Sequence, residues 1–398
     1  MKRLSTRASG LAASPIRKLM PFAVGAKERG THVHHLNIGQ PDIPTPKPVL
    51  DALRGYEPDV IAYAQSQGDP GYLESVHDYY RGIGLDIPAG GITITTGGSE
   101  AILFAFLAAF NPGDEILVPE PFYTNYNTMA HAVGVTIVPI TTSIDTGFHL
   151  PSDDAIRALI TPRTAGVLLC HPSNPTGTVY TREEIDRIVG IVKENDFWFI
   201  VDEVYREFVF DPAPNHLYSV LELEGLDDRV IVVDSISKRF SMCGARLGAL
   251  VTRNTEIGEA ALKLGQARLS SPKIEQHIAT AAHALPAQYI DDMIAQYRER
   301  RDLVFAALND IPGVCSAKPE GAFYTIPQLP VDDAEDFAKW LLTDFSLEGE
   351  TLMVAPAAGF YKTPGLGRNE VRIAYVLETE LLERSMRILR EALAAYNR

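Results

Sequence analysis

Four short apolar runs constrain the fold of this chain more than any other feature of its sequence. Within each run, polar residues do not alternate with apolar ones, so a strand built from it would be apolar on both faces. Strands of this kind are typical of parallel sheets that helices cover on both sides. The runs are ILV at 116–118, GVLLC at 166–170, FWFIVD at 197–202 and RVIVVD at 229–234.

Helical stretches separate these runs. SEAILFAFLAAF at 99–110 is strongly apolar, and TREEIDRIVGIVKEN at 181–195 opens with the Thr-x-x-Glu spacing of a capping box. Strands that alternate with helices predict an α/β domain over residues 47–290, with a mostly parallel central sheet flanked by helices.

The pattern of apolar strands alternating with helices ends near residue 290. A charged helical stretch at 286–311 precedes strand-like pieces at 321–326 and 370–376 and a closing helix from Glu378. This order predicts a smaller α+β domain, and the first forty residues carry no strong pattern. The predicted division is 1–46 as an N-terminal segment that packs with the small domain, 47–290 as the large domain and 291–398 as the small domain.

Charge and cysteine content limit the partners of the chain. It has 36 basic and 51 acidic residues and a net charge of −15, which disfavours nucleic acid and anionic membranes as main partners. The three cysteines, Cys170, Cys243 and Cys315, form no CxxC pair, so neither a disulfide framework nor a cysteine-rich zinc site is supported. The sequence shows neither a signal peptide nor an apolar run of about 18 residues, so we expect a cytoplasmic protein. We also expect no metal site.

The segment DSISKRFSMCGARLG at 234–248 carries the strongest chemical signal. Lys238 follows an apolar strand, at the sheet edge where α/β proteins bind ligands. There, desolvation and a neighbouring cation lower the pKa of a lysine enough for it to form a Schiff base. The hydroxyls of Ser235 and Ser237 and the guanidinium of Arg246 would bind a phosphate. The alternative for this segment alone is a solvated lysine beside a surface arginine.

Two further strand ends carry polar side chains. In FWFIVDEVYREF, Asp202 ends an apolar strand and Tyr205 follows it. In a pyridoxal phosphate site, Asp202 would keep the pyridine nitrogen protonated and Tyr205 would donate to the ring oxygen. In HPSNPTG at 171–177, two prolines frame Asn174, and this turn directs its amide to the same oxygen. A capping aspartate, core aromatics and an ordinary loop are the alternatives.

Three weaker signals complete the candidate site. TITTGGSEAILFAF at 93–106 places two glycines before a helix, so the amides of Gly98, Ser99 and Glu100 could hold a phosphate. Tyr123 in PEPFYTNY could stack on a planar ring, although a core position is the alternative. Arg372 in EVRIAYV suits a carboxylate, or is an exposed arginine of an edge strand.

The order and spacing of these motifs are more specific than any one of them. The motifs follow one another along the chain in the order GGSE, PEPFYTNY, SNPTG, VDEVY, SxSK with an arginine eight residues on, and VRIAY. In this order the chain resembles class I/II pyridoxal-phosphate aminotransferases of fold type I. The resemblance also covers NIGQPDIPTP at 37–46, YAQSQGDPGYLE at 63–74 and PEGAFYTI at 319–326.

The resemblance implies a role for each matching residue. Lys238 would be the Schiff-base lysine and proton carrier, Asp202 the partner of the pyridine nitrogen, and Tyr205 and Asn174 the partners of the ring hydroxyl. Tyr123 would cover the face of the ring. The phosphate would be held by Gly98, Ser99, Glu100, Ser235 and Arg246, and by Tyr63 from the partner subunit of a homodimer with shared sites. The substrate α-carboxylate would be held by Gly39, Asn174 and Arg372.

The function implied is transfer of an amino group between an L-amino acid and a 2-oxo acid, by a ping-pong mechanism. We expect an aspartate- or aromatic-type enzyme that uses 2-oxoglutarate. Ser99 stands where some bacterial relatives place a lysine that reads the distal carboxylate. Arg268 from the partner subunit is therefore a candidate reader, with a plain surface arginine as the alternative, and the long stretch 355–375 predicts a loop over the substrate entrance.

Other functions stay open at this point. A different pyridoxal phosphate reaction, such as C–S lysis or cyclopropane formation, would use the same cofactor groups. A non-catalytic regulatory relative normally carries a fused DNA-binding segment, for which residues 1–36 are too short. A nicotinamide dehydrogenase is disfavoured because no G-x-G-x-x-G follows an early strand.

Overall fold

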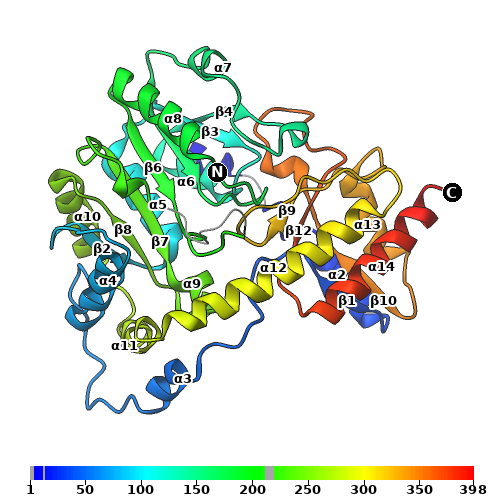
Figure 1. Ribbon diagram of the computed structural model, residues 1–398, viewed down its shortest axis with the longest axis horizontal. Coiled ribbons are helices and arrows are strands. Elements are labelled where there is room, and N and C mark those ends of the chain that lie inside the picture. The colour runs from blue at the N-terminus through cyan, green and yellow to red at the C-terminus, as the bar shows by residue number, and fades with distance from the viewer. Residues whose placement is uncertain (1–3, 12–13, 211–218) are drawn as a thin grey trace.

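A seven-stranded sheet forms the centre of the computed structural model, which describes residues 4–11, 14–210 and 219–398 (Figure 1). The strand order is β2-β8-β7-β6-β5-β3-β4, in which β3 to β7 are parallel and β8 is antiparallel to β7 and β2. The mostly parallel sheet predicted from the apolar runs is confirmed. The strands are β2 Ile92–Thr95, β3 Glu115–Glu120, β4 Thr136–Thr141, β5 Thr164–Cys170, β6 Trp198–Asp202, β7 Val230–Ser235 and β8 Gly248–Val251.

Alternate residues of these strands enter two different cores. Leu168 and Ile200 pack with the helices of one face, whereas Leu169, Phe199 and Val201 pack with those of the other. Because successive side chains of a strand point to opposite faces, a strand that is buried on both sides must be apolar throughout. One face carries α5 Gly97–Ala109, α6 Asn125–Val133 and α10 Thr255–Ala267, and the other carries α4 Pro70–Gly82, α8 Arg182–Asn195 and α11 Lys273–His283.

Local signals set several helix ends. The hydroxyl of Thr181 accepts from the Glu184 amide, and the Glu184 carboxylate accepts from the Thr181 amide, so the predicted capping box is present. Ser235 caps the short helix α9 Ile236–Arg239 in the same way, by accepting from the Ser237 amide at 3.2 Å. This cap holds the turn that carries Lys238 directly against the end of β7.

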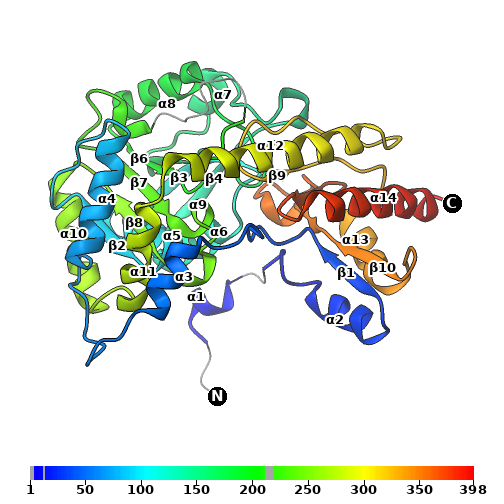
Figure 2. The ribbon, with the colours of Figure 1, turned by 60° about the horizontal axis from the view of Figure 1, so that its bottom comes forward.

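The C-terminal part is built around a small antiparallel sheet of order β11-β12-β9. The long helix α12 Ala287–Asn309 runs from the central sheet toward this sheet, and α14 Thr379–Tyr396 packs along α12 (Figure 2). The predicted helices at 286–311 and from Glu378 are confirmed, whereas the strand-like piece at 321–326 yields only two strand residues. The remaining elements here are β9 Tyr324–Thr325, α13 Ala334–Thr343, β10 Glu350–Met353, β11 Ala355–Pro356 and β12 Val371–Ala374.

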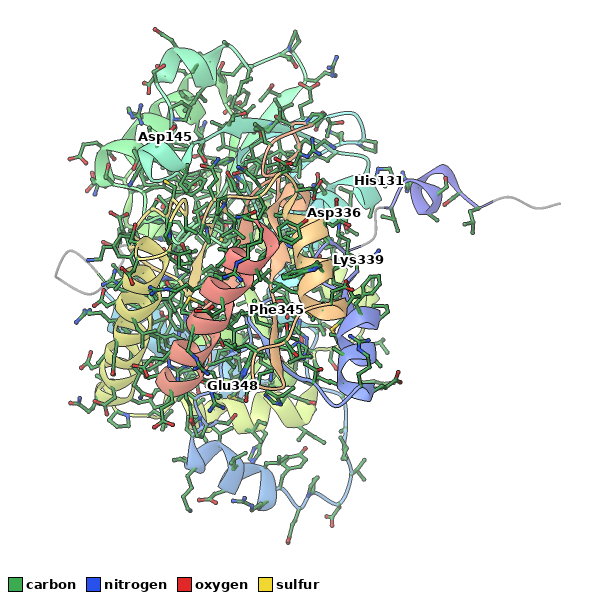
Figure 3. All side chains as sticks on the ribbon, turned by 90° about the vertical axis from the view of Figure 1, so that its right-hand side faces the viewer. His131, Asp145, Asp336, Lys339, Phe345 and Glu348 are labelled. Carbon is green, nitrogen blue, oxygen red and sulfur yellow. The ribbon has the colours of Figure 1, made fainter. Side chains whose placement is uncertain are left out.

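The N-terminal residues are more regular than their sequence indicates. β1 His32–His35 pairs in parallel with β10, and α2 Met20–Glu28 packs against α13. The Lys339 ammonium of α13 lies 5.1 Å from the ring centroid of Phe22 on α2, on the face that Figure 3 shows. The remaining helices are α1 Thr6–Ser9, α3 Lys47–Arg54, α7 Asp153–Arg157, η1 Ile144–Thr146, η2 Val220–Glu222, η3 Cys243–Ala245 and η4 Ala357–Phe360. Within the described ranges, no helix has the length and apolar character needed to cross a bilayer.

Candidate active site

A cavity of about 370 Å³ lies where β5, β6 and β7 end. Parallel strands bring their carboxyl ends to one edge of a sheet, and ligands of α/β proteins bind at that edge. The cavity is also bordered by the start of α5 and by residues of the small sheet. Of the predicted site residues, it brings together Gly39, Gly98, Ser99, Tyr123, Asn174, Asp202, Tyr205, Ser235, Lys238, Arg246 and Arg372.

Two predicted residues do not line this cavity. Tyr63 lies in the exposed segment between α3 and α4, with 78% of its surface accessible. Glu100 lies on the first turn of α5, where its carboxylate accepts from the Thr96 amide at 2.7 Å and pairs with Arg268 at 3.2 Å. The side chain of Glu100 therefore stabilises the turn that opens α5, and the predicted role of Tyr63 toward a partner subunit stays a prediction.

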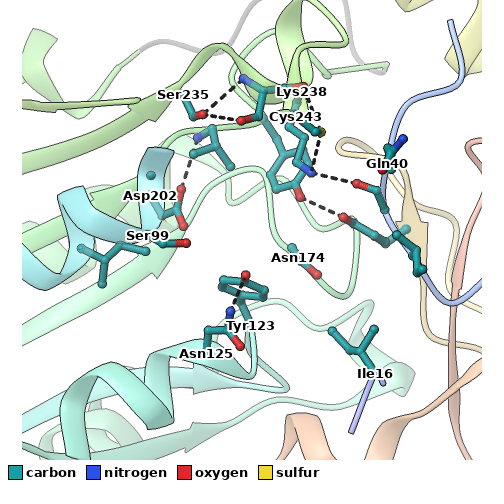
Figure 4. Close-up of a pocket in the computed structure, with 18 of the residues that line it drawn as sticks. Ile16, Gln40, Ser99, Tyr123, Asn125, Asn174, Asp202, Ser235, Lys238 and Cys243 are labelled. Atoms are coloured by element: carbon teal, nitrogen blue, oxygen red, sulfur yellow. Dashed lines mark hydrogen bonds between the residues drawn. The ribbon is translucent and has the colours of Figure 1, made fainter. Parts of the chain in front are cut away.

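Lys238 projects into the cavity from α9 (Figure 4). Its Nζ donates to the Gly39 carbonyl at 2.8 Å and lies 3.7 Å from Cys243 Sγ. The same Nζ lies 5.7 Å from the ring centroid of Phe323 and 6.0 Å from that of Tyr205. A half-buried amine among aromatic rings, with one carbonyl and one thiol as neighbours, is placed to react with a ligand in the cavity.

Asp202 ends β6 on the same side of the cavity and is 4% exposed. Its Oδ2 accepts from the Tyr126 hydroxyl at 2.6 Å, and its Oδ1 accepts from the Val204 amide at 3.3 Å. Burial raises the pKa of Asp202 to about 6, while these two donors oppose the shift. A buried carboxylate of this kind is stabilised further by any cation that enters the cavity.

Arg372 of β12 is 2% exposed and lines the cavity in contact with Asn174. Its Nη1 donates to Asn174 Oδ1 at 3.0 Å and its Nη2 donates to the Asn37 carbonyl at 2.7 Å. Burial lowers the pKa of Arg372, and its Nε has no hydrogen-bond partner within the described residues. A buried guanidinium without a carboxylate partner fits the capture of an anionic ligand.

Tyr324 closes the cavity beside Arg372 and was not among the predicted residues. Its hydroxyl lies 2.9 Å from the hydroxyl of Tyr205, and its ring centroid lies 4.5 Å from the Arg372 guanidinium. A Cβ added at Gly39 would lie 1.8 Å from the Tyr324 hydroxyl, so only glycine fits there without moving the tyrosine. Gly39 thereby presents its backbone to the cavity, as its carbonyl contact with Lys238 shows.

A polar cradle lies at the start of α5. Gly97 has a φ of 74°, and a Cβ at this position would lie 2.5 Å from Arg246 Nη2. The close approach brings the Arg246 guanidinium to the amide end of α5, next to Ser99. The Ser235 hydroxyl lies 2.9 Å from Ser237 Oγ at the same end of the cavity. Helix amides, two hydroxyls and a guanidinium form a set that suits a phosphate group.

Buried ion pairs connect α9 to the end of β7. Asp234, at the end of β7, accepts from Arg239 Nη2 at 2.9 Å and from the Tyr80 hydroxyl at 3.2 Å. Although burial opposes ionisation, Arg239 and Arg206 hold the pKa of Asp234 below its ordinary value. Because a buried ion pair resists separation, this network fixes the helix on which Lys238 stands.

Arg268 lies within its own chain rather than at a free surface. Its Nε pairs with Glu100 at 3.2 Å, and its other nitrogens donate to the Ser271 hydroxyl and the Ile94 carbonyl. These contacts make Arg268 more than a plain surface arginine, and its predicted role as a substrate reader in the partner subunit stays a prediction. Glu100 belongs to the predicted phosphate cradle, and no motif in the sequence predicts its pairing with Arg268.

The segment 355–370 contributes none of the residues that line the cavity, and it lies behind Arg372. The Phe360 ring centroid lies 5.0 Å from the Arg372 guanidinium, and the buried Glu120 accepts from the Lys362 and Thr363 amides. The predicted loop over the entrance is thus a support for Arg372. Ser237, predicted with Ser235 as a phosphate donor, also lines the cavity. Several other lining residues had no role predicted from the motifs, namely Ser14, Ile16, Arg17, Ile38, Gln40, Asn125 and Tyr324.

Comparisons with known proteins identify the family. The model of the family described as aminotransferase class I and II matches residues 31–389. The chain is 30% identical to an aspartate aminotransferase of Streptomyces avermitilis over 97% of its length and 96% of the relative. It is also 30% identical to aromatic-amino-acid aminotransferase 2 of Thermococcus litoralis, over 96% of each chain.

A solved structure shows the same fold. The alanine aminotransferase of Pyrococcus furiosus superposes with a TM-score of 0.88 at 28% identity, over 99% of this chain and 100% of that one. The family match spans the central sheet, the lysine-bearing helix α9 and the small sheet with Arg372. The chain is therefore a fold type I aminotransferase that belongs to the class I and II family.

Proposed function

We propose that this aminotransferase moves an amino group between an L-amino acid and 2-oxoglutarate with pyridoxal 5′-phosphate as its cofactor. The observation that carries the proposal is the meeting of Lys238, Asp202 and the polar cradle of α5 in one cavity. We further propose aspartate or an aromatic amino acid as the donor, which the names of the two relatives support.

The residues of the cavity fit this cofactor in chemistry and in order. The amides at the start of α5, with Ser99, Ser235 and Arg246, would hold the phosphate. Asp202 would contact the pyridine nitrogen, and Tyr123 would cover the ring. Asn174 and Tyr205 would bind the ring oxygen. When bound, the cofactor supplies an aldehyde that condenses with amines and a ring that accepts an electron pair from the substrate.

The side chains of this chain then divide the work. Lys238 Nζ, whose hydrogen-bond partners are the Gly39 carbonyl and the Cys243 thiol, would accept the proton from the substrate Cα and carry it to the acceptor carbon. Asp202, as a carboxylate, would stabilise a proton on the ring nitrogen of the bound cofactor. Arg372 and Asn174 fix the α-carboxylate, so that the Cα–H bond faces Lys238.

Tyr126 sets the pH at which Asp202 does this. Burial raises the Asp202 pKa to about 6, and the Tyr126 hydroxyl stabilises the ionised form. In Y126F the lost donor raises the Asp202 pKa further, so the carboxylate protonates at a higher pH. We expect the acid limb of the kcat/KM profile to move to higher pH, with a smaller effect above pH about 8. An unshifted acid limb, measured between pH 5 and 9, would contradict this role.

The fork of Arg372 is expected to set substrate affinity. In R372K the charge is kept, but the second nitrogen donor toward a carboxylate is lost. Because a hydrogen bond to a charged group contributes ~1.5–3 kcal/mol, we expect KM for the amino acid to rise roughly 10- to 100-fold with a smaller change in kcat. Steady-state kinetics measure both, and a loss confined to kcat would argue for a different role.

We also propose a homodimer in which Tyr63 reaches the phosphate of the partner subunit. Val60, Ile61 and Tyr63 are 74%, 64% and 78% exposed, which is a large apolar surface for one short segment. Such a surface is typical of a protein contact. The division into a large domain over 47–290 and a small domain over 291–398 stays part of this proposal.

A panel of amino donors and 2-oxo acceptors tests the proposed function. The holoenzyme should exchange amino groups between aspartate or an aromatic amino acid and 2-oxoglutarate, with the parallel-line kinetics of a ping-pong mechanism. Absence of exchange with glutamate or 2-oxoglutarate would overturn the proposed acceptor. Release of pyruvate and ammonia without an acceptor would instead identify an elimination reaction.

A further inference from the structure

The cavity has an excess of positive charge in a chain whose net charge is −15. Four basic side chains line it, and Asp202 is the one acidic side chain among the lining residues that the structure describes. The four are Arg17, Lys238, Arg246 and Arg372. Concentrating cations in one concavity of an acidic protein favours a ligand that carries several negative charges.

Three of these cations have contacts that account for them. Arg372 is buried against Asn174, Arg246 lies against the amide end of α5, and Lys238 contacts the Gly39 carbonyl. One α-carboxylate and one phosphate would match the two arginines. The fourth cation, Arg17, is left over by this assignment.

Arg17 is exposed at the cavity, and its guanidinium makes no hydrogen bond or ion pair with any part of the chain that the structure describes. Its neighbour Lys18 differs, because the Lys18 ammonium pairs with Glu335 of α13. Two adjacent cations of one segment therefore have different surroundings: one is paired away from the cavity, and the other lines the cavity without a partner.

Hydrogen bonds hold the backbone beside Arg17 close to the carboxylate-binding residues. Asn37 Nδ2 donates to the Ile16 carbonyl at 3.1 Å, and the Asn37 carbonyl accepts from Arg372 Nη2 at 2.7 Å. Ile16 lies across the cavity from Ser235 and Lys238 in Figure 4. The buried side chain of Leu19, two residues beyond Arg17, fixes the other side of the segment. Arg17 thus lines the cavity from a segment whose backbone Asn37 links to Arg372.

The other candidates for reading a substrate side chain are occupied or neutral. Arg268 is held by Glu100, Ser271 and the Ile94 carbonyl. Ser99 carries no charge. Ile16, Ile38 and Gln40, which share the N-terminal side of the cavity with Arg17, are also neutral.

We propose that Arg17 binds the second carboxylate of a dicarboxylic substrate, and so makes the enzyme selective for acidic amino acids and their 2-oxo acids. This inference rests on the proposed function and names the residue that selects the substrate class. With the α-carboxylate on Arg372, the side chain of a four- or five-carbon diacid would extend toward the N-terminal segment. A guanidinium offers two parallel donors to such a carboxylate.

The test compares R17Q, R17K and the matched control K18Q, which removes the adjacent cation that does not line the cavity. Binding of succinate and of butyrate to the holoenzyme is titrated by the absorption change of the bound cofactor, without turnover. We expect R17Q to weaken succinate binding roughly 10- to 100-fold and butyrate binding less than about twofold, because one charged hydrogen-bond pair is lost. R17K should recover part of the affinity, and K18Q should bind both compounds as the unaltered enzyme does.

Turnover provides the second measurement. In R17Q, kcat/KM should fall for glutamate and stay within about twofold for alanine, since only glutamate carries the second carboxylate. Equal effects of R17Q on succinate and butyrate, or no effect on either, would overturn the role of Arg17 while amino transfer persists. If the unaltered enzyme transfers no amino group from any donor, the proposed function itself fails, which is a separate outcome.

Discussion

K238A is expected to lower kcat by at least roughly 10³-fold, because the variant loses both the amine that reacts with the cofactor aldehyde and the group that moves the Cα proton. In the structure, the Cys243 thiol and the Gly39 carbonyl are the hydrogen-bond partners of Lys238 Nζ. Neither group is a base as strong as an amine, so neither should replace Lys238 in moving the Cα proton. Single-turnover measurement with an amino donor separates this loss from any change in product release.

K263A is the matched control for this variant. Lys263 lies on the exposed face of α10, outside the cavity, and its removal should leave kcat unchanged. Because the buried pair of Asp234 and Arg239 supports α9 independently of the lysine side chain, K238A should keep the folded structure. Retention of more than about a tenth of the activity in K238A would contradict the assigned role.

D202N is expected to give the second-largest loss, roughly 10²- to 10³-fold in kcat. The substitution replaces the negative charge of Asp202, which stabilises the charge that develops in the transition state, by a neutral amide of the same shape. The Asp202 carboxylate has the Tyr126 hydroxyl and the Val204 amide as its partners. An asparagine keeps the volume of the side chain, so the loss reports on charge rather than on packing.

The pH dependence of D202N makes this prediction specific. The unaltered enzyme should lose activity as the pH falls through the range in which Asp202 protonates, and D202N should lack that acid limb. D196N, which changes an exposed aspartate at the end of α8, provides the control and should behave as the unaltered enzyme. An acid limb that persists in D202N would assign the titration to another group.

Much of the central fold could be predicted because its signals are local. The runs around Leu168 and Ile200 are apolar at every position, which specifies a sheet covered on both faces without any knowledge of its partners. The direction of β8 and the pairing of β1 with β10 were not predicted. HVHH at 32–35 mixes polar and apolar residues, and only its contact with distant residues of the chain makes it a strand.

The candidate site divides in the same way. Lys238, Asp202 and Asn174 follow strand ends in recognisable motifs, so their meeting at one sheet edge could be anticipated. Tyr126 lies in a quoted motif, but its hydrogen bond to Asp202 depends on the packing of α6 against the sheet. Arg17 enters the cavity from a segment without a strong pattern. The ion pair of Arg268 with Glu100 likewise depends on how the chain folds, and no motif indicates it.

The proposed reaction requires Lys238 to be the residue that joins the cofactor. Borohydride reduction of the holoenzyme, followed by mass spectrometry of its tryptic peptides, tests this directly. We expect a pyridoxyl modification on Lys238 alone, and we expect prior incubation with an amino donor to prevent it. A modification on a different lysine, or amino transfer by an enzyme that acquires none, would contradict it.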